Sequence, residues 1–259
     1  MNQKISVFII TLNENQNIAR CLEKLFWADE IIIVDSGSID ETVEIGLLYN
    51  AKIIFHKFDN FGKQKQFALA QTKNDWVLSI DADEVLSDSL INEIQNTVFT
   101  AEFVGYTIPR THVFLGKIFR FGAENERPIL RLFNKKNGFF IENKIHETIV
   151  VNGKIAKYKN EMLHYSGEQL TKVVAKCFSY ALLNGELMFA KGKRTFFVKL
   201  MVKFPFEFVR VFLYHRNFLN GYQGFLWSMF SALGSFLKYV NLWELQRNSV
   251  NSSASDIHL

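Results

Sequence analysis

Two aspartates spaced two residues apart, Asp81 and Asp83, are the residues of this sequence best suited to hold a metal ion. The apolar run over residues 76–80 precedes them and predicts a buried strand, and residues two apart on an extended chain project to one side. Two carboxylates there can bind a hard divalent cation, Mg²⁺ or Mn²⁺, which in turn binds a diphosphate. The alternative is that the acids only satisfy a strand end or a helix start. The strand before them and the helix predicted after them favour the metal site.

Polar side chains also follow the two apolar runs nearest the N-terminus. Thr11, Asn13 and Glu14 come after the first run, and Asp35 comes after the second. Thr11 and Glu14 match a capping box that would start a helix, and contact with a nucleotide is the alternative for all three residues. Asp35 can accept a hydrogen bond from a base N–H or a ribose hydroxyl. It can equally close an Asx turn on the Ser-Gly-Ser that follows it.

Two lysines and a histidine could also either bind a ligand or have only a structural role. Lys63 and Lys65 open a predicted helix, where the helix dipole disfavours cations, so an anionic ligand such as a nucleotide would explain them. Lys63 also fits a solvated helix face. His164 stands in an apolar run, where a histidine is either a satisfied core residue or a ligand.

A further group of charged residues lies in the middle of the chain. Glu147 is flanked by apolar residues, and a partly desolvated glutamate can act as a general base; an edge-strand salt bridge is the alternative. Glu124, Glu126 and Arg127 form a charged loop that we interpret as facing an acceptor, together with His146 beside the predicted base.

The elements that position these residues alternate between strands and helices over the first hundred residues. Strands are predicted at residues 5–10, 31–34, 52–56 and 76–80, and helices at 14–26, 41–49, 63–71 and 88–98. This alternation predicts an α/β fold with a mostly parallel sheet covered on both faces. Ligands of such sheets bind at the carboxyl ends of the strands. Neither a G-x-G-x-x-G fingerprint nor a P-loop occurs, which excludes those two ways of binding phosphate.

The pattern changes after residue 100 and divides the chain into predicted domains. Shorter strands are predicted at residues 103–110, 111–119, 129–133 and 138–141, followed by helices at 168–190 and 195–215. We therefore predict an α/β domain over residues 1–167 that holds the candidate base and metal ligands. Its first half, 1–100, holds the candidate nucleotide contacts, and its second half, 101–167, holds the loop that we interpret as facing an acceptor. A helical region follows at 168–247, and a disordered tail at 248–259.

The charge is concentrated in the helical region. Residues 191–247 hold nine Lys or Arg and two Asp or Glu, in a chain whose formal net charge is +4 and which contains 26 phenylalanines. A basic and aromatic helical extension predicts an anionic membrane surface or an anionic substrate as partner. The alternative is that these helices only pack on the α/β domain. The basic excess is modest and no motif that recognises RNA or DNA appears in the sequence, so no nucleic-acid partner is predicted.

The composition excludes several other classes of protein. The chain has 259 residues, 48% of them hydrophobic, which is enough for one large α/β domain with a helical appendage. It is too poor in proline and glycine for a collagen-like or disordered chain. Cys21 and Cys177 lie too far apart for a disulfide scaffold or a zinc ribbon. The opening run is too short for a signal peptide, so we expect a cytoplasmic protein.

Three segments of the sequence resemble a known family. They are Ile5-Ser-Val-Phe-Ile-Ile-Thr-Leu-Asn-Glu14, Ile31-Ile-Ile-Val-Asp-Ser-Gly-Ser38 and Trp76-Val-Leu-Ser-Ile-Asp-Ala-Asp-Glu84. Together they resemble the family 2 glycosyltransferases of the GT-A fold. Further segments are similar to the branch that adds glucose to heptose, in a β-1,4 linkage, in the core of bacterial lipopolysaccharide. These are Trp27-Ala-Asp-Glu30, Gly62-Lys-Gln-Lys65, Arg131-Leu-Phe133, Ile145-His-Glu147 and Leu242-Trp-Glu-Leu-Gln246.

The resemblance implies roles for the residues singled out above. It implies an inverting transfer from a nucleoside-diphosphate sugar with Mg²⁺ or Mn²⁺ as cofactor. It implies that Asp83 ligates the metal, that His164 is an additional ligand, and that Glu147 is the base. The residues it implies for the nucleotide are Thr11, Glu14, Asp35, Lys65 and, near the ribose, Asp81.

The branch implies the partners and the location. The donor would be UDP-glucose, and the acceptor an inner-core heptose of lipid A-core at the cytoplasmic face of the inner membrane, to which the basic helices attach peripherally. One departure is that Asn125-Glu126-Arg127-Pro128 stands where the branch has an aromatic pair before proline. The alternative acceptors are a polyprenyl phosphate or an exopolysaccharide. An alternative of another class is a membrane-surface binding protein with a degenerate sugar-nucleotide site.

Overall fold

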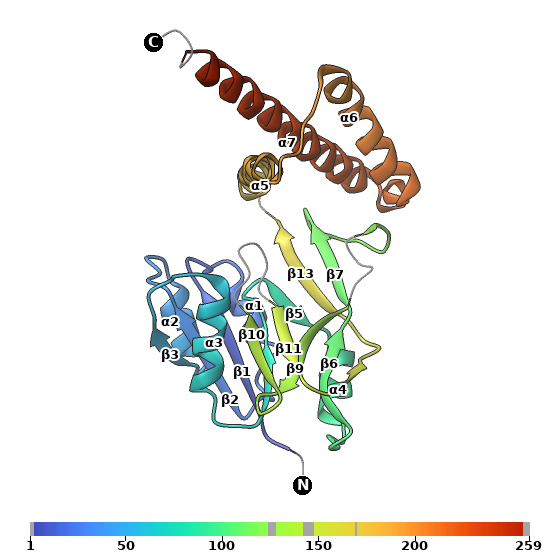
Figure 1. Ribbon diagram of the computed structural model, residues 1–259. Helices are drawn as coiled ribbons and strands as arrows, with labels where there is room; N and C mark the ends of the chain where they lie inside the picture. Colours follow the sequence, from blue (N-terminus) through green and yellow to red (C-terminus); the bar gives the residue numbers. More distant parts are fainter. Residues whose placement is uncertain (1–2, 124–127, 142–147, 169, 256–259) are drawn as a thin grey trace. The chain divides into compact units, whose positions relative to one another are not determined.

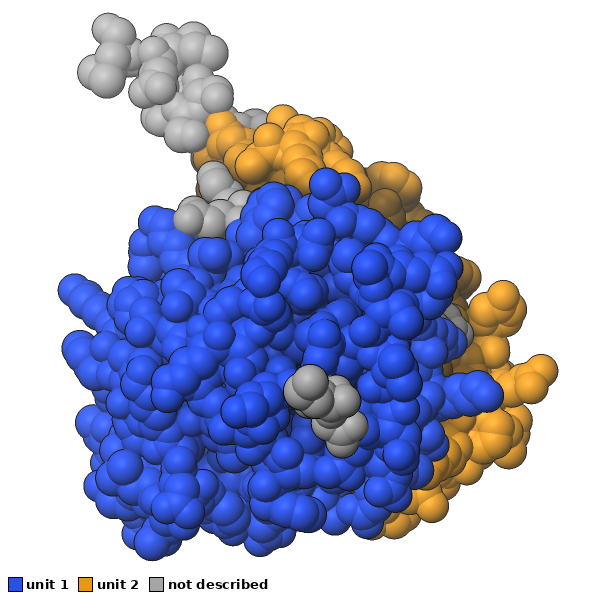
Figure 2. All heavy atoms as spheres, turned by 90° about the horizontal axis from the view of Figure 1, so that it is seen from below, with its two compact units in different colours: residues 1–112, 126–165 blue, residues 113–125, 166–259 orange. Residues whose placement is uncertain are grey.

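The computed structural model describes residues 3–123, 128–141, 148–168 and 170–255 (Figure 1). The chain divides into two compact units, which Figure 2 distinguishes by colour. The first comprises residues 1–112 and 126–165, and the second comprises residues 113–125 and 166–259. The boundary between them falls within two strands, β7 (Arg110–Phe114) and β13 (Met162–Gly167).

The first unit is built on a seven-stranded sheet. Its strands are β1 (Ile5–Thr11), β2 (Glu30–Asp35), β3 (Lys52–Phe55), β4 (Trp76–Ser79), β6 (Phe103–Ile108), β9 (Ile129–Asn134) and β12 (Lys154–Lys157). They lie in the order β12-β6-β9-β4-β1-β2-β3. The four strands β4, β1, β2 and β3 pair in parallel, and β9 pairs antiparallel with β4 and β6. The sheet is therefore mostly parallel, as the sequence predicts.

Apolar side chains cover both faces of this sheet because successive residues of a strand point to opposite sides. Val7 and Ile9 of β1 belong to one buried cluster, and Phe8 belongs to the other. The Val7 side is covered by α1 (Ile18–Leu22), α2 (Thr42–Leu48) and α4 (Asp88–Gln95), and the Phe8 side by α3 (Phe61–Gln71) (Figure 1). Each fully buried Val, Ile, Leu or Phe side chain stabilises the fold by about 1.5–3 kcal/mol.

The first helix is shorter than the residues 14–26 predicted for it. It begins at Ile18 and ends at Leu22, and a turn in which the Leu25 amide donates to the Leu22 carbonyl at 2.9 Å continues it. Ile18, Cys21, Leu22 and Leu25 are all buried. A short helix and a turn thus satisfy the apolar periodicity that predicted a longer helix.

Smaller sheets complete the strand-rich part. β10 (Gly138–Ile141) and β11 (Thr148–Val151) pair antiparallel. A second sheet has the order β5-β13-β7-β8, with β5 at Glu84–Leu86 and β8 at Lys117–Ile118. Residues 111–119 were predicted as one strand, but Leu115 and Gly116 have φ of 45° and 73° and turn the chain. Two successive residues with positive φ form the tight turn that suits a hairpin.

The second unit is mainly helical. Its long helices are α5 (Leu170–Ala190), α6 (Phe197–Val209) and α7 (Tyr222–Ser255), with a π-helical turn, η2 (Arg210–Tyr214), and a short 3₁₀ helix, η3 (Asn217–Asn220). Small residues let helices α5 and α7 approach closely: a Cβ on Gly234 would lie 3.0 Å from Cys177 Sγ. Of the helices in the described ranges, α5 alone has the length and hydropathy of a membrane span, with 17% of its most apolar stretch buried. One such helix is weak evidence for a span.

Two boundaries in this unit differ from the predicted domains. Residues 113–125 belong to the helical unit because Phe114 and Phe119 pack with Val173, Trp227 and Phe230. In addition, α7 continues through Ser255, past position 248 where the predicted tail begins. Extending an existing helix adds a hydrogen bond per residue, and asparagine and serine cost only a fraction of a kcal/mol each, about 0.7 or less.

Candidate active site

The carboxyl ends of three adjacent strands bring together residues that the sequence singled out. Thr11 ends β1 and Asp35 ends β2, and the two are register partners, with Thr11 Oγ1 donating to Asp35 Oδ2 at 3.0 Å. Asp81 follows β4, whose extension is held beside β1 by the Ile80 amide donating to the Phe8 carbonyl at 3.2 Å. Parallel strands end at one edge of their sheet, so these side chains share that edge as predicted.

Asp35 organises the loop after β2. Its Oδ1 accepts the amides of Gly37 and Ser38 at 2.9 and 2.8 Å, and its side chain is buried. This is the predicted Asx turn, and Gly37 has a φ of +101° that a residue without a Cβ adopts freely. Asp35 therefore shapes the loop, and its contact with a nucleotide stays a prediction.

The loop after β1 is locked to the loop after β2. The Asn13 amide donates to Ser38 Oγ at 2.9 Å, Asn13 Oδ1 accepts the Ile39 amide at 2.9 Å, and the Glu14 amide donates to Thr42 Oγ1 at 2.8 Å. The helix-starting capping box predicted for Thr11 and Glu14 is wrong. Thr11 is the last residue of β1, its hydroxyl donates to Asp35, and the helix starts only at Ile18. The nucleotide roles of Thr11, Asn13 and Glu14 stay predictions.

Asp81 lies between two buried cations. Its Oδ1 is 2.8 Å from Lys65 Nζ, and its Oδ2 accepts a hydrogen bond from Arg131 Nη2 at 2.6 Å. The Lys65 and Arg131 side chains are only 2% and 8% exposed. Burial alone would raise the pKa of Asp81, but Arg131 and Lys65 hold it well below its usual range. Asp81 is therefore a fixed negative charge, and Lys65 is tied to it.

Arg131 and Glu84 are part of this cluster, although the sequence analysis gave neither of them a role. Arg131 Nη2 also donates to Glu84 Oε1 at 2.6 Å, and Glu84 Oε2 accepts the Asp81 amide at 3.1 Å. Glu84 is completely buried, and burial raises its pKa despite Arg131. The sequence does contain an indication of this cluster. Arg131 is the lone charged residue in the apolar run Ile129–Asn134, and a cation in a buried strand requires an anionic partner.

Asp83 and His164 meet beside this cluster. His164 Nε2 lies 3.3 Å from Asp83 Oδ2, and the two side chains are 17% and 25% exposed. They are brought together because β13 pairs antiparallel with β5, with His164 opposite Glu84, and the Tyr165 amide donates to the Asp83 carbonyl at 2.8 Å. The two predicted metal ligands, far apart in the chain, are thus neighbours.

This donor set fits a divalent cation. A carboxylate and an imidazole suit Mn²⁺, and the carboxylate suits Mg²⁺, which keeps several ligand positions for substrate oxygens and water. Both Asp81 oxygens face cations, so Asp83 and His164 are the candidate metal donors that we single out among the described residues of this edge. Within the described ranges, no group of three or more His, Cys, Asp or Glu could hold a metal.

The predicted base and acceptor residues lie outside the described residues. They are Glu124, Glu126, Arg127, His146 and Glu147. The strand β9 follows the first group in the chain, and β10 and β11 flank the second.

The charge on Asp81 predicts a specific acid response. Its pKa is lower in the folded than in the unfolded chain, so its ionised form stabilises the fold above the unfolded value of about 3.9, and this contribution is lost as pH falls below it. Asp81→Asn should therefore show a weaker loss of stability than wild type between about pH 5 and pH 3. Urea midpoints measured across that range test this. The control is Asp75→Asn, which removes an exposed carboxylate. If the urea midpoint fell equally with pH in wild type and in Asp81→Asn, the prediction would be contradicted.

Comparison with known proteins defines the class. Residues 6–158 match the model of glycosyl transferase family 2. An uncharacterized glycosyltransferase of Rickettsia typhi is 34% identical over 273 residues, which cover 99% of this chain and 92% of that protein. The chain therefore belongs to glycosyl transferase family 2, and its α/β sheet with C-terminal helices is the fold that the motifs predict.

Two further similar proteins have names that state a pathway or a bound ligand. The lipopolysaccharide core biosynthesis glycosyltransferase LpsC of Rhizobium meliloti is 33% identical over 253 residues, 93% of this chain and 92% of LpsC. A crystal structure of S. aureus TarS with UDP-GlcNAc matches 42% of this chain with 23% identity and a TM-score of 0.37. The protein is thus a family 2 glycosyltransferase that is similar over almost its whole length to a lipopolysaccharide core enzyme.

Proposed function

We propose that this glycosyltransferase moves glucose from UDP-glucose to an inner-core heptose of lipopolysaccharide, with inversion at the anomeric carbon. The observation that carries the proposal is the Asp83–His164 pair beside the fixed charge of Asp81 at the carboxyl edge of the sheet. The similarity to LpsC supports the acceptor class. The resemblance of the motifs to the glucosyltransferase branch supports the donor.

The Asp81 cluster would hold the ribose of the nucleotide. Each Asp81 oxygen has one cation partner, and a carboxylate has about four acceptor positions, so it can still accept a ribose hydroxyl. Lys65 and Arg131 fix the carboxylate in place, and the linked loops of Asn13 and Asp35 fix the neighbouring edge. A preformed edge costs less to order when the donor binds.

Asp83 and His164 would hold Mg²⁺ or Mn²⁺ beside the diphosphate. The bound ion would neutralise the negative charge that develops on the departing UDP. Asp83 contributes the anionic ligand, and the hydrogen bond from the Tyr165 amide to the Asp83 carbonyl keeps the backbone at this position in place. His164, from the neighbouring strand, would contribute an imidazole nitrogen.

Glu147 is proposed as the base of the transfer. The acceptor hydroxyl oxygen forms a bond to the anomeric carbon while the bond from that carbon to the diphosphate oxygen breaks. The hydroxyl proton would pass to the Glu147 carboxylate, and a base in this role has to act on the acceptor side because inversion requires attack opposite the leaving group. Glu124, Glu126, Arg127 and His146 are proposed to contact the acceptor.

The helical unit is proposed to attach the enzyme peripherally to the cytoplasmic face of the inner membrane. Phe197, Val198 and Met201 of α6 are each more than half exposed, on a segment rich in Lys and Arg. Exposed apolar side chains next to cations are the combination that binds anionic membranes. Attachment would bring the enzyme to an acceptor embedded in the same membrane.

The donor and acceptor are tested with a panel of nucleotide sugars. With Mn²⁺ and lipopolysaccharide truncated at the inner-core heptose, we expect UDP release from UDP-glucose to exceed release from UDP-galactose and UDP-GlcNAc by about tenfold or more, since a site that hydrogen-bonds a substrate hydroxyl rejects a sugar in which that hydroxyl is inverted or replaced. Release that depends on a polyprenyl phosphate instead would replace the proposed acceptor. Failure to bind any nucleotide would favour a membrane-surface binding protein.

A further inference from the structure

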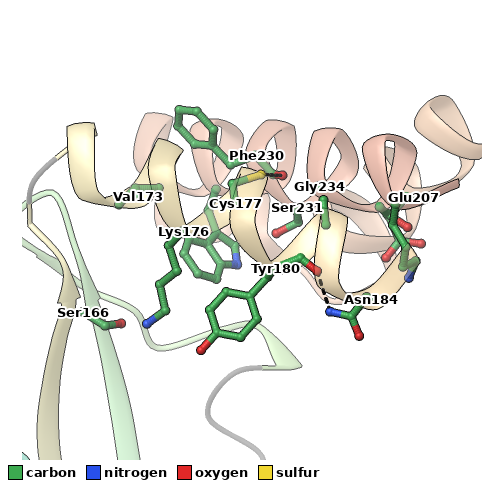
Figure 3. A pocket seen from close by; sticks show the side chains of 14 residues that line it. Ser166, Val173, Lys176, Cys177, Tyr180, Asn184, Glu207, Phe230, Ser231 and Gly234 are labelled. Carbon is green, nitrogen blue, oxygen red and sulfur yellow. Dashed lines mark hydrogen bonds between the residues drawn. The ribbon is translucent and has the colours of Figure 1, made fainter. Parts of the chain in front are cut away.

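A pocket in the helical unit has no part in the proposed transfer. Its volume is about 420 Å³, and its lining residues all belong to the second unit, whereas the candidate active-site residues described above belong to the first. The lining comes from α5, α6, α7 and Ser166 of β13 (Figure 3). A pocket of this size can take a small ligand or a lipid headgroup.

The pocket is cationic. Lys176 of α5 and Lys238 of α7 line it, and in the described part of the chain neither lysine has an ion-pair partner. Glu207 also lines it, but this carboxylate is 3.2 Å from Lys203 Nζ and accepts a hydrogen bond from Arg210. Burial would raise the pKa of Glu207, and these two cations lower it, so Glu207 is ionised and its charge is already compensated. The two lysines therefore leave an uncompensated positive charge.

The remaining lining is suited to an amphiphile. Val173, Trp227 and Phe230 form an apolar wall from α5 and α7. Figure 3 shows the Lys176 ammonium and the Tyr180 hydroxyl extending toward the side on which Ser166 lies. An ammonium next to hydroxyl donors is a set of groups that binds a phosphate oxygen. The apolar wall suits the adjoining apolar part of the ligand.

The outer surface of α5 points to a membrane as the source of that ligand. Phe178, Leu182 and Leu183 lie on the same helix as the lining residues, and each is between 42% and 50% exposed. Water-exposed apolar side chains on a helix that also lines a cationic pocket suit a ligand that carries both acyl chains and a phosphate. A free phosphate would use the lysines but would leave these side chains without a partner.

We propose that this pocket binds the headgroup phosphate of an anionic membrane phospholipid, with Lys176 and Lys238 as its cationic ligands. The proposal deepens the membrane attachment proposed above and rests on it for the choice of a lipid. It gives the attachment a defined lipid site, so that binding depends on these two lysines more than on the general positive charge of the unit.

Cys177 provides a direct measure of pocket occupancy. It lines the pocket, and the other cysteine, Cys21, is completely buried, so alkylation of the native protein reports Cys177. The full chain is alkylated with and without short-chain phosphatidylglycerol, below the concentration at which it aggregates. We expect the lipid to slow alkylation by about fivefold or more at saturation. Short-chain phosphatidylcholine and inorganic phosphate at equal concentrations should each give less than twofold, by the same mass-action argument.

Variants separate a site from general charge. Lys176→Gln with Lys238→Gln should abolish the protection, measured as a rate ratio within each variant. Lys191→Gln with Lys193→Gln removes the same charge from exposed positions that do not line the pocket, and should keep the protection. No protection in wild type, equal protection by phosphatidylcholine or phosphate, or full protection in the pocket variant would each overturn the proposal.

Vesicle binding keeps the two proposals apart. When phosphatidylglycerol vesicles are sedimented, they should carry down a larger fraction of wild type and of the Lys191/Lys193 control than of the pocket variant. If vesicles bind wild type and the pocket variant equally while Cys177 stays unprotected, the pocket proposal fails and membrane attachment stands. If short-chain lipid protects Cys177 but vesicles bind neither protein, the membrane attachment fails instead.

Discussion

Arg131→Met should destabilise the protein by about 3–5 kcal/mol, because removing one partner of a buried ion pair leaves the others uncompensated. Arg131 Nη2 bonds both Asp81 Oδ2 and Glu84 Oε1 at 2.6 Å, and its side chain is only 8% exposed. Methionine fills much of the space but leaves the Glu84 carboxylate buried without its closest cation. Urea unfolding at neutral pH measures the loss.

Two further variants identify the cause of that loss. Adding Glu84→Gln to Arg131→Met should restore part of the stability, since it removes the charge that the arginine compensated. Lys136→Met breaks an ion pair with Asp75 of the same 2.6 Å length, but its two side chains are 69% and 48% exposed. That control should change stability by about 0.5 kcal/mol or less. A loss below about 1 kcal/mol in Arg131→Met would show that the buried cluster is not compensated as described.

Asp83→Asn should lower the turnover number by a factor on the order of 10²–10³, the effect typical of losing one group that stabilises developing charge. An amide keeps the shape of the side chain but loses the anionic ligand that the proposed metal site requires. The Asp83 side chain is 25% exposed, so stability should change by about 1 kcal/mol or less. Steady-state UDP release at saturating Mn²⁺ measures the turnover.

A second measurement shows whether the metal is the reason. The affinity for Mn²⁺, followed by electron paramagnetic resonance in the presence of UDP, should fall in Asp83→Asn and in His164→Ala. Asp75→Asn removes a carboxylate that is bound to Lys136 at the surface, and both properties should stay unchanged in this control. Full turnover and unchanged Mn²⁺ affinity in Asp83→Asn would remove Asp83 from the metal site.

The sheet edge could be predicted because it depends on local patterns. Strands β1 and β2 end at Thr11 and Asp35, Asp81 follows β4 closely, and parallel strands that alternate with helices must end at one edge. The Asx turn of Asp35 was one of two local readings of Asp-Ser-Gly-Ser. Residues within a few positions of one another were enough to predict these features.

The rest of the site depends on contacts between distant segments. His164 reaches Asp83 only because β13 pairs with β5, and an apolar run alone does not specify its partner strand. Arg131 joins Asp81 and Glu84 through the pairing of β9 with β4, which reverses the parallel order that the first hundred residues establish. The family resemblance placed His164 near the metal, but it gave no role to Arg131.

Periodicity also overestimated one helix. Ile18, Cys21, Leu22 and Leu25 recur as on a helix, yet tertiary hydrogen bonds hold the segment before Ile18, such as that from the Glu14 amide to Oγ1 of Thr42, the first residue of α2. Tertiary hydrogen bonds outweighed local preference here. The same contacts form the edge at which we propose that the nucleotide binds, so the departure from the predicted helix lies at the candidate site itself.

The most direct test of the proposed function is the structure of the product. Wild-type enzyme is incubated with ¹³C-labelled UDP-glucose, Mn²⁺ and lipopolysaccharide truncated at the inner-core heptose, and the glycolipid is analysed by NMR. The account predicts one labelled glucose joined to heptose through a β linkage, since inversion converts the α-linked donor to a β-linked product. An α linkage would contradict the single displacement, and free glucose with unmodified glycolipid would contradict transfer to this acceptor.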